Sequence, residues 1–104
     1  MTGAASEMTP FQRQLFNTVA GLSPGEVVSF GDVAARAGRP GASRAAGRML
    51  ATIKDSGLPW WRVVYSSGKL PPCNPTLQKK RLREEGVKLK RDRVVNAPSG
   101  RFES

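Results

Sequence analysis

The sequence of 104 residues has no histidine and a single cysteine, Cys73, and these two scarcities exclude several kinds of site. Zinc centres built from cysteine and histidine are excluded, and so is acid–base catalysis by an imidazole. One cysteine cannot form an internal disulfide, which agrees with a reducing compartment. We expect neither a bound metal nor another cofactor.

Long apolar runs are also missing, and no stretch reaches the length needed to span a membrane. The first residues lack the basic start and apolar centre of a secretion signal. We therefore expect a soluble, intracellular protein without a membrane partner. Its length predicts one domain over residues 1–104, with a core over about 9–89 and flexible ends at 1–8 and 96–104.

Acidic residues are few, with eight Asp and Glu against seventeen Lys and Arg, a net charge of +9. The segment Arg36–Arg93 holds fifteen basic and four acidic residues, a local balance of +11. Such an excess favours a polyanionic partner, with nucleic acid ahead of a membrane surface. A solvated basic surface without a partner is the alternative interpretation.

The first helix is predicted from its start signals. Thr9 is suited to cap it, Pro10 to take the first helical position, and Gln12 to complete a capping box. Ser23–Gly25 forms the stop, and Val27–Val28 follows as a short extended link. Apolar residues at helical spacing are Phe11, Leu15, Phe16 and Val19.

Two further helices follow closely. Ser29 and Asp32 form a second capping pair, which opens a helix from Phe30 to about Ala37, and Gly38 supplies the left-handed residue that ends it. A third helix is predicted from about Ala42 to Ile53. Two short helices joined by a glycine-containing turn are typical of a helix-turn-helix.

The third helix has two different faces. At 100° per residue its core stripe comprises Ala46, Met49, Leu50 and Ile53. The opposite face comprises Arg44, Gly47, Arg48 and Ala51. Arginines among residues without bulk make a surface that can press against a groove wall. The alternative is that Gly47 only packs closely and the arginines are solvated.

The second half of the chain predicts a strand-like segment at Pro59–Tyr65, a tight turn at Ser66–Gly68 and a last helix from Asn74 to Gly86. We expect Val87–Leu89 to pack back on the core. The fold class predicted is mainly α, a single winged helix-turn-helix domain with a short hairpin-like wing.

The segment PWWRVVYSSG resembles the active-site motif of the O6-alkylguanine-DNA alkyltransferases, a proline-cysteine-histidine-arginine-valine run followed by serine and glycine. The stretch VVSFGDVAARAG…SRAAGRML resembles the DNA-binding segment of that family in order and spacing, and RLREEGVKL resembles its terminal helix. The resemblance covers Thr9 to Leu89, and the combination of motifs is specific.

Two departures from the motif bear on activity. Trp60 stands where the family has its nucleophilic cysteine, and Trp61 stands where it has its histidine. Alkyl transfer needs a thiolate activated by an adjacent base, and tryptophan supplies neither. A tryptophan in the cysteine position resembles the alkyltransferase-like branch, which binds alkylated guanine without repairing it. We therefore expect no enzyme activity. That branch usually keeps a histidine after the tryptophan, so Trp61 is a further departure.

The resemblance implies roles for individual residues. Arg44 matches an arginine that enters the duplex through the minor groove and fills the space of the extruded base, and Ala45 and Gly47 match small residues that let the helix approach. Phe30 stands where the family usually has tyrosine. The DNA-binding residues implied are Phe30, Ser43, Arg44, Ala45, Gly47 and Arg48.

The resemblance also implies a pocket for the damaged base. The lesion-pocket residues implied are Leu50, Trp60, Trp61, Val63 and Ser67. Arg62 resembles a structural residue that holds the site's loop to the terminal helix, and Glu85 matches the acidic residue of the family's triad. From the residues alone, both tryptophans could instead belong to the core.

The partner implied is double-stranded DNA containing O6-alkylguanine, with the damaged base flipped out of the helix. The branch is associated with nucleotide-excision repair, so repair proteins of that pathway are expected as further partners. We expect a monomer in the cytoplasm or on the nucleoid. The alternative function is a sequence-reading, winged-helix transcriptional regulator, although the third helix offers few side chains for reading bases.

Overall fold

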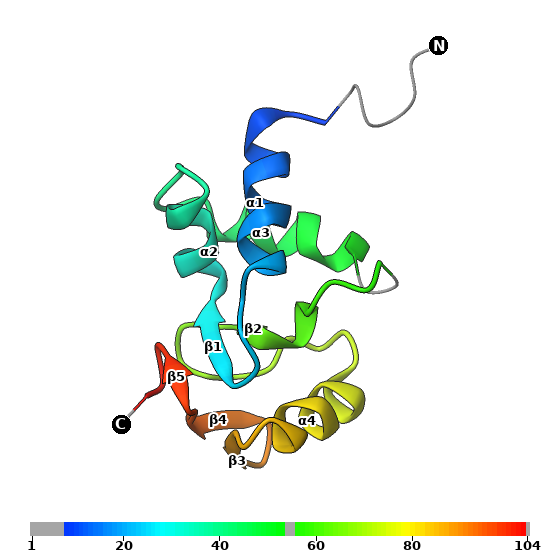
Figure 1. Ribbon diagram of the computed structural model, residues 1–104, viewed down its shortest axis with the longest axis vertical. Coiled ribbons are helices and arrows are strands. Elements are labelled where there is room, and N and C mark those ends of the chain that lie inside the picture. Colours follow the sequence, from blue (N-terminus) through cyan, green and yellow to red (C-terminus); the bar gives the residue numbers. More distant parts are fainter. Residues whose placement is uncertain (1–7, 54–55, 104) are drawn as a thin grey trace.

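The computed structural model describes residues 8–53 and 56–103, so the flexibility expected of residues 1–7 and 104 concerns residues outside the described part. Three helices pack together at one end of the long axis. Small sheets and a fourth helix occupy the other end (Figure 1).

The first two helices begin where their capping signals predict. In α1, Pro10–Ala20, the backbone N–H of Gln12 donates to the Thr9 hydroxyl over 3.1 Å, and the Thr9 N–H donates back to the Gln12 side chain. In α2, Phe30–Arg36, Ser29 and Asp32 exchange the same pair of hydrogen bonds over 3.0 and 2.9 Å. Both predicted capping boxes are confirmed.

The third helix is shorter than expected. An α-helix, α3, covers Ser43–Leu50, and a 3-10 turn over Ala51–Ile53 tightens its end. The predicted core stripe is confirmed, because three of its residues are buried and Met49 packs against them. The helical cluster, as we call this part of the core, comprises Phe11, Leu15, Val19, Leu22, Val28, Val33, Ala34, Ala37, Ala46, Leu50, Ile53 and Val63.

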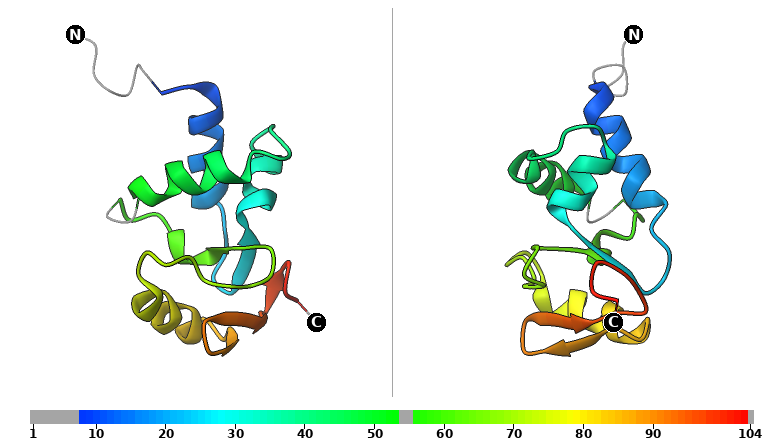
Figure 2. Two further views of the ribbon diagram at one scale, coloured as in Figure 1. Left: turned by 180° about the vertical axis from the view of Figure 1, so that it is seen from behind. Right: turned by 90° about the vertical axis from the view of Figure 1, so that its left-hand side faces the viewer.

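A three-stranded parallel sheet joins distant parts of the chain. Its central strand is β1, Glu26–Ser29, which the sequence predicted only as an extended link. It pairs with β2, Val63–Val64, on one side and with β5, Ser99–Gly100, on the other. Figure 2 shows this sheet between the three helices and the segment 75–96.

The segment Pro59–Tyr65 is only partly extended, which corrects the expected strand. Trp60–Arg62 form a 3-10 turn, closed by the Arg62 N–H donating to the Pro59 carbonyl over 3.2 Å. Proline has no N–H for a strand ladder, and the turn brings Arg62 within reach of Glu85. The tight turn at Ser66–Gly68 is present, closed by the Gly68 N–H donating to the Tyr65 carbonyl.

The last helix, α4, covers Pro75–Glu84 and is capped by the Asn74 side chain. It packs beside an antiparallel hairpin of β3, Lys88–Lys90, and β4, Arg93–Asn96. The predicted packing of Val87 and Leu89 onto a core is confirmed. This second core, the C-terminal cluster, comprises Val27, Val64, Leu70, Leu82, Val87, Val94 and Ala97.

The tail was expected to be loose from residue 96 onward, and the described part of it is not. Ala97 is buried, and β5 adds a strand to the edge of β1, so the tail's backbone groups find partners. The Arg101 guanidinium also donates to Asp32 over 3.1 Å. Among the described residues, no helix is long and apolar enough to cross a membrane.

Candidate functional site

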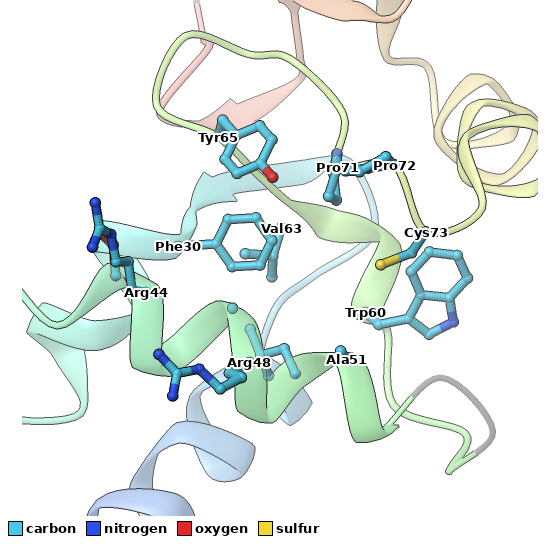
Figure 3. Close-up of a pocket in the computed structure, with 13 residues that line it drawn as sticks. Phe30, Arg44, Arg48, Ala51, Trp60, Val63, Tyr65, Pro71, Pro72 and Cys73 are labelled. Atoms are coloured by element: carbon cyan, nitrogen blue, oxygen red, sulfur yellow. The ribbon is translucent and has the colours of Figure 1, made fainter.

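A pocket of about 420 Å³ opens between α3 and the chain that follows β2 (Figure 3). The exposed face of α3 forms its floor, and Trp60 stands at one end. Pockets of this volume are large enough for a small molecule or a nucleobase. Its lining residues are Phe30, Ser43, Arg44, Gly47, Arg48, Leu50, Ala51, Trp60, Val63, Tyr65, Pro71, Pro72 and Cys73.

The α3 face carries two exposed arginines beside the pocket. Arg44 lies in the first turn of the helix and Arg48 one turn later, so both extend from the same side. Neither forms an ion pair with a residue inside the ranges 8–53 and 56–103. Both guanidinium groups are therefore available to a ligand with negative charge.

Gly47 leaves the middle of this face flat. A Cβ at this position would meet only the Phe30 ring, at 3.8 Å, which is an ordinary van der Waals contact. Close packing inside the protein therefore does not require glycine here. This observation weighs against the alternative that Gly47 serves internal packing alone.

Trp60 is half-buried and forms one wall of the pocket. One part of it packs against the helical cluster, and the rest faces the cavity near Cys73 (Figure 3). Leu50 and Val63, both buried, contribute apolar atoms to the lining. Trp60 is thus both a core contact and a pocket residue.

Phe30 and Tyr65 form an aromatic pair at the pocket. Their ring centroids lie 5.5 Å apart with the planes tilted by 53°. Figure 3 shows Tyr65 above Phe30, and 43% of Tyr65 is exposed. A phenol hydroxyl is therefore present at the pocket even though Phe30 has none.

The structure separates the residues named from the sequence into two groups. Ala45, Trp61 and Ser67 do not line the pocket. Ala45 packs against the helical cluster, Trp61 against the C-terminal cluster, and Ser67 lies exposed in the turn after Tyr65. Trp61 and Ser67, which were expected in the lesion pocket, therefore lie outside the lining of this cavity. The residues that do line it are Phe30, Ser43, Arg44, Gly47, Arg48, Leu50, Trp60 and Val63.

Arg62 and Glu85 form a nearly buried ion pair behind the pocket. The guanidinium donates from Nη2 to Glu85 Oε2 over 2.6 Å and from Nε to Glu85 Oε1 over 2.9 Å, and its Nη1 donates to the Leu22 carbonyl over 2.8 Å. Arg62 thus ties the turn beside Trp60 to the end of α4 and to the loop after α1.

Glu85 accepts further hydrogen bonds. The Gly25 N–H donates to it over 2.8 Å, at a left-handed backbone position (φ +84°) where a Cβ would press on Pro98. Burial alone would raise the pKa of Glu85, but hydrogen bonds from Arg62, Gly25 and Trp61, together with the Arg62 charge, hold that pKa below its usual value. The carboxyl is therefore ionised at neutral pH.

Sequence reasoning did not place Tyr65, Pro71, Pro72 or Cys73 in the site. Tyr65 enters it directly after β2, and the other three enter it because the turn at Ser66–Gly68 folds the chain back, which is a tertiary effect. Gln78 was also missed. It is 1% exposed and donates to the carbonyls of Trp61 and Val63 from one turn before the buried Leu82, a helical spacing that could have identified it.

The chemistry available in the pocket is limited. Its lining contains apolar and aromatic groups, two arginines, hydroxyls and one thiol, without a carboxylate or an imidazole. Within the described residues, no three His, Cys, Asp or Glu side chains gather as metal ligands would. The arrangement suits binding a flat apolar group beside a polyanion.

Comparison with known proteins identifies the family. The family model described as "6-O-methylguanine DNA methyltransferase, DNA binding domain" matches residues 10–87. The chain belongs to this family. The match includes α1 to α4, both tryptophans and the whole floor of the pocket.

Several similar proteins carry the name DNA base-flipping protein, among them one from Vibrio parahaemolyticus and one from Escherichia coli. The one from Vibrio parahaemolyticus is 35% identical over 79% of this chain and 85% of its own length. The one from Escherichia coli is 40% identical over 74% of this chain, and the match spans 62% of that relative. A methylated-DNA–protein-cysteine methyltransferase of Salmonella typhimurium is 37% identical, over 78% of this chain and 49% of its own length.

Solved structures of an alkyltransferase-like protein from Schizosaccharomyces pombe are similar in fold. One, in complex with DNA, has a TM-score of 0.73 at 25% identity, covering 94% of each chain. Another, in complex with damaged DNA containing O6-carboxymethylguanine, has a TM-score of 0.72 at 26% identity, covering 86% of this chain and 83% of that one. The family thus includes both methyltransferases and proteins named for base flipping.

Proposed function

We propose that this protein binds O6-alkylguanine in duplex DNA, receives the flipped base in the pocket and leaves the alkyl group on it. The observation that carries the proposal is Trp60, an indole that lines the pocket and that, by the resemblance of its segment to the alkyltransferase motif, stands in the cysteine position. A binding protein needs a pocket for the base but no activated nucleophile, and we assign only the pocket to this chain.

The physics of base flipping fits this arrangement. Extruding a base costs a few kcal/mol, and the cost is least where pairing is already damaged. An O6-alkyl group spoils the pairing of guanine with cytosine, so the lesion lowers the cost of its own extrusion. The alkyl group then gains by contact with Trp60, Leu50 and Val63, at roughly 25 cal/mol per Å² of apolar surface removed from water.

The α3 face is proposed to meet the minor groove. Arg44 enters the base stack and occupies the vacated space, where a guanidinium can stack on neighbouring bases and donate to the orphaned cytosine. Arg48 contacts phosphate. Gly47 and the small side chain of Ala45 allow the backbone of α3 to come close to the groove.

Alkyl transfer is not part of the proposed function. Tryptophan has no nucleophilic sulfur, and the chain has no histidine to act as a base. Cys73 lines the pocket, but it follows Trp60 by thirteen residues and reaches the site from the loop before α4. Its thiol has no imidazole to activate it.

Further aspects follow from the family. The turn at Ser66–Gly68 is proposed as the wing of a winged helix-turn-helix formed with α2 and α3. The protein is proposed to bind damaged DNA as a monomer. The resulting complex is proposed to mark the lesion for nucleotide-excision repair proteins. We propose that the protein acts on the nucleoid or in the cytoplasm, since its proposed ligand is chromosomal DNA.

A competition titration tests the proposal. A duplex with one O6-methylguanine should bind more tightly than the same duplex without damage, whatever the flanking sequence. Trp60→Ala should weaken binding to the damaged duplex more than binding to the undamaged one. A sequence-reading regulator would show the reverse pattern, with affinity set by the flanking bases and indifferent to the methyl group.

A further inference from the structure

Trp61 lies outside the pocket yet has several specific contacts. Its indole Nε1 donates to Glu85 Oε2 over 2.9 Å. The Arg81 guanidinium lies over its ring at 4.7 Å from the centroid, and that of Arg62 at 5.2 Å. The hydrogen bond from the indole N–H and the two cation–π contacts with arginines together restrict the position and the orientation of the indole.

Trp61 also touches the wall of the pocket. The centroids of Trp60 and Trp61 lie 6.0 Å apart with their planes at 86°, an edge-to-face arrangement. The two residues are neighbours in the 3-10 turn Trp60–Arg62, and they pack against different cores, Trp60 on the helical cluster and Trp61 on the C-terminal cluster. Trp60 is only half-buried, so the Trp61 ring supplies part of the support that the core does not.

We propose that Trp61 is a positioning residue, which holds the Trp60 indole in place as the pocket wall and anchors it to α4 through Glu85 and Arg81. This inference rests on the proposed function, since the pocket wall matters for the damaged base. It also explains why a bulky residue is accommodated behind the pocket. Arg62, Arg81 and Glu85, which contact the Trp61 indole, do not line the pocket.

The geometry distinguishes this role from simple core packing. A residue that only filled the C-terminal cluster would need burial and no particular partner. Trp61 instead uses its one donor on Glu85, which is itself fixed by Arg62 and by the Gly25 N–H. The orientation of Trp60 is thereby connected to a network of charged hydrogen bonds rather than to apolar contact alone.

Two single-tryptophan variants test the inference. Trp61→Phe and Trp61→Ala each leave Trp60 as the only tryptophan, so its fluorescence anisotropy reports its mobility directly. Phenylalanine keeps an aromatic edge against Trp60 but loses the donor to Glu85, and alanine loses both. Without DNA, we expect fast local motion of Trp60 in Trp61→Ala and restricted motion in Trp61→Phe.

Binding supplies the second measurement. The preference for the O6-methylguanine duplex should fall roughly two- to tenfold in Trp61→Ala, as expected when an aromatic pair is lost, while affinity for undamaged DNA stays the same. Trp61→Phe should keep more of the preference. Phe102→Ala is the matched control, because Phe102 packs against the same C-terminal cluster and is not paired with Trp60. It should lower stability without changing the preference.

The outcomes are distinct. If Trp60 stays rigid and the preference is unchanged in Trp61→Ala, or if Phe102→Ala lowers the preference equally, Trp61 is a core residue and the inference is wrong. If the wild type itself does not prefer the damaged duplex, the proposed function fails. In that case the anisotropy of Trp60 alone decides whether Trp61 positions it.

Discussion

Arg44 and Arg48 lie one helical turn apart on the same face, and the proposed function gives them different tasks. Arg44→Ala should remove most of the lesion preference and most of the base extrusion, because nothing then fills the vacated space. Arg48→Ala should weaken damaged and undamaged binding alike, by roughly 1 kcal/mol or less, and reduce the salt dependence of binding. Fluorescence of a 2-aminopurine base next to the lesion and titrations at several salt concentrations measure the two effects.

The same experiment can contradict the assignment. If Arg48→Ala abolished the lesion preference while Arg44→Ala changed only general affinity, the two arginines would have exchanged roles. The orientation of α3 on DNA would then differ from the one proposed here.

Gly47 offers a second test at the scale of one residue. Gly47→Ala should stabilise the free protein by about 0.5–1 kcal/mol, because alanine is the better helix former and its Cβ meets only ordinary contact with Phe30. The same methyl group would stand on the face proposed to meet the groove, so DNA affinity should fall. Thermal unfolding and a binding titration separate the effects, and an unchanged affinity would mean that this face does not contact DNA.

The elements around the pocket are held together by the Arg62–Glu85 pair, which joins the 3-10 turn to the end of α4. The pKa of Glu85 is lower in the folded protein than in the unfolded chain, where it is ordinarily 4.5. The ionised carboxyl therefore contributes to the free energy of unfolding at pH values above 4.5, and this contribution is lost as the pH falls through the pKa of the folded state. Unfolding free energy should therefore decrease on acidification below about pH 4.5.

Glu85→Gln isolates this contribution. The variant should be less stable at neutral pH by roughly 1–3 kcal/mol, because Arg62 loses its charged partner, and the difference from wild type should shrink as pH falls. Asp92, whose pKa is lowered by its hydrogen bond to Lys79, is present in both proteins and cancels in the comparison. A difference that does not vary with pH would contradict the role given to the ionised carboxyl.

Local signals in the sequence were sufficient for the helices. The capping pairs Thr9–Gln12 and Ser29–Asp32 act within four residues, and the structure contains both. The strands were harder to predict. β2 and β5 are two residues long, and β1 pairs with partners more than thirty residues away, so pairing depends on tertiary contacts that no local pattern records.

In the site, too, some residues could be predicted from local sequence and others depend on tertiary contacts. The motif predicted Trp60, Val63 and the arginine face of α3, all of which line the pocket. The motif could not place Trp61. Neighbouring residues in a 3-10 turn can pack against different clusters, and here Trp60 packs against the helical cluster and Trp61 against the C-terminal cluster. The loop residues Tyr65 and Cys73 reach the pocket only through the fold of the chain after β2.

For the molecule as a whole, the proposed function combines a basic surface with a pocket whose one thiol, Cys73, has no imidazole to activate it. In the proposed function, the net charge of +9 supplies affinity for any duplex and the pocket supplies the preference for damage. Binding and alkyl transfer can be separated in one experiment, because a label on the O6-methyl group follows the methyl carbon wherever it goes.

The most direct measurement is therefore recovery of that label. The protein is incubated with a duplex carrying one O6-methylguanine labelled in the methyl group, the complex is isolated, and protein and DNA are separated under denaturing conditions. We predict that the label enters the complex in preference to an undamaged competitor and returns entirely with the DNA. Label bound covalently to the protein, at Cys73 or elsewhere, would contradict the account.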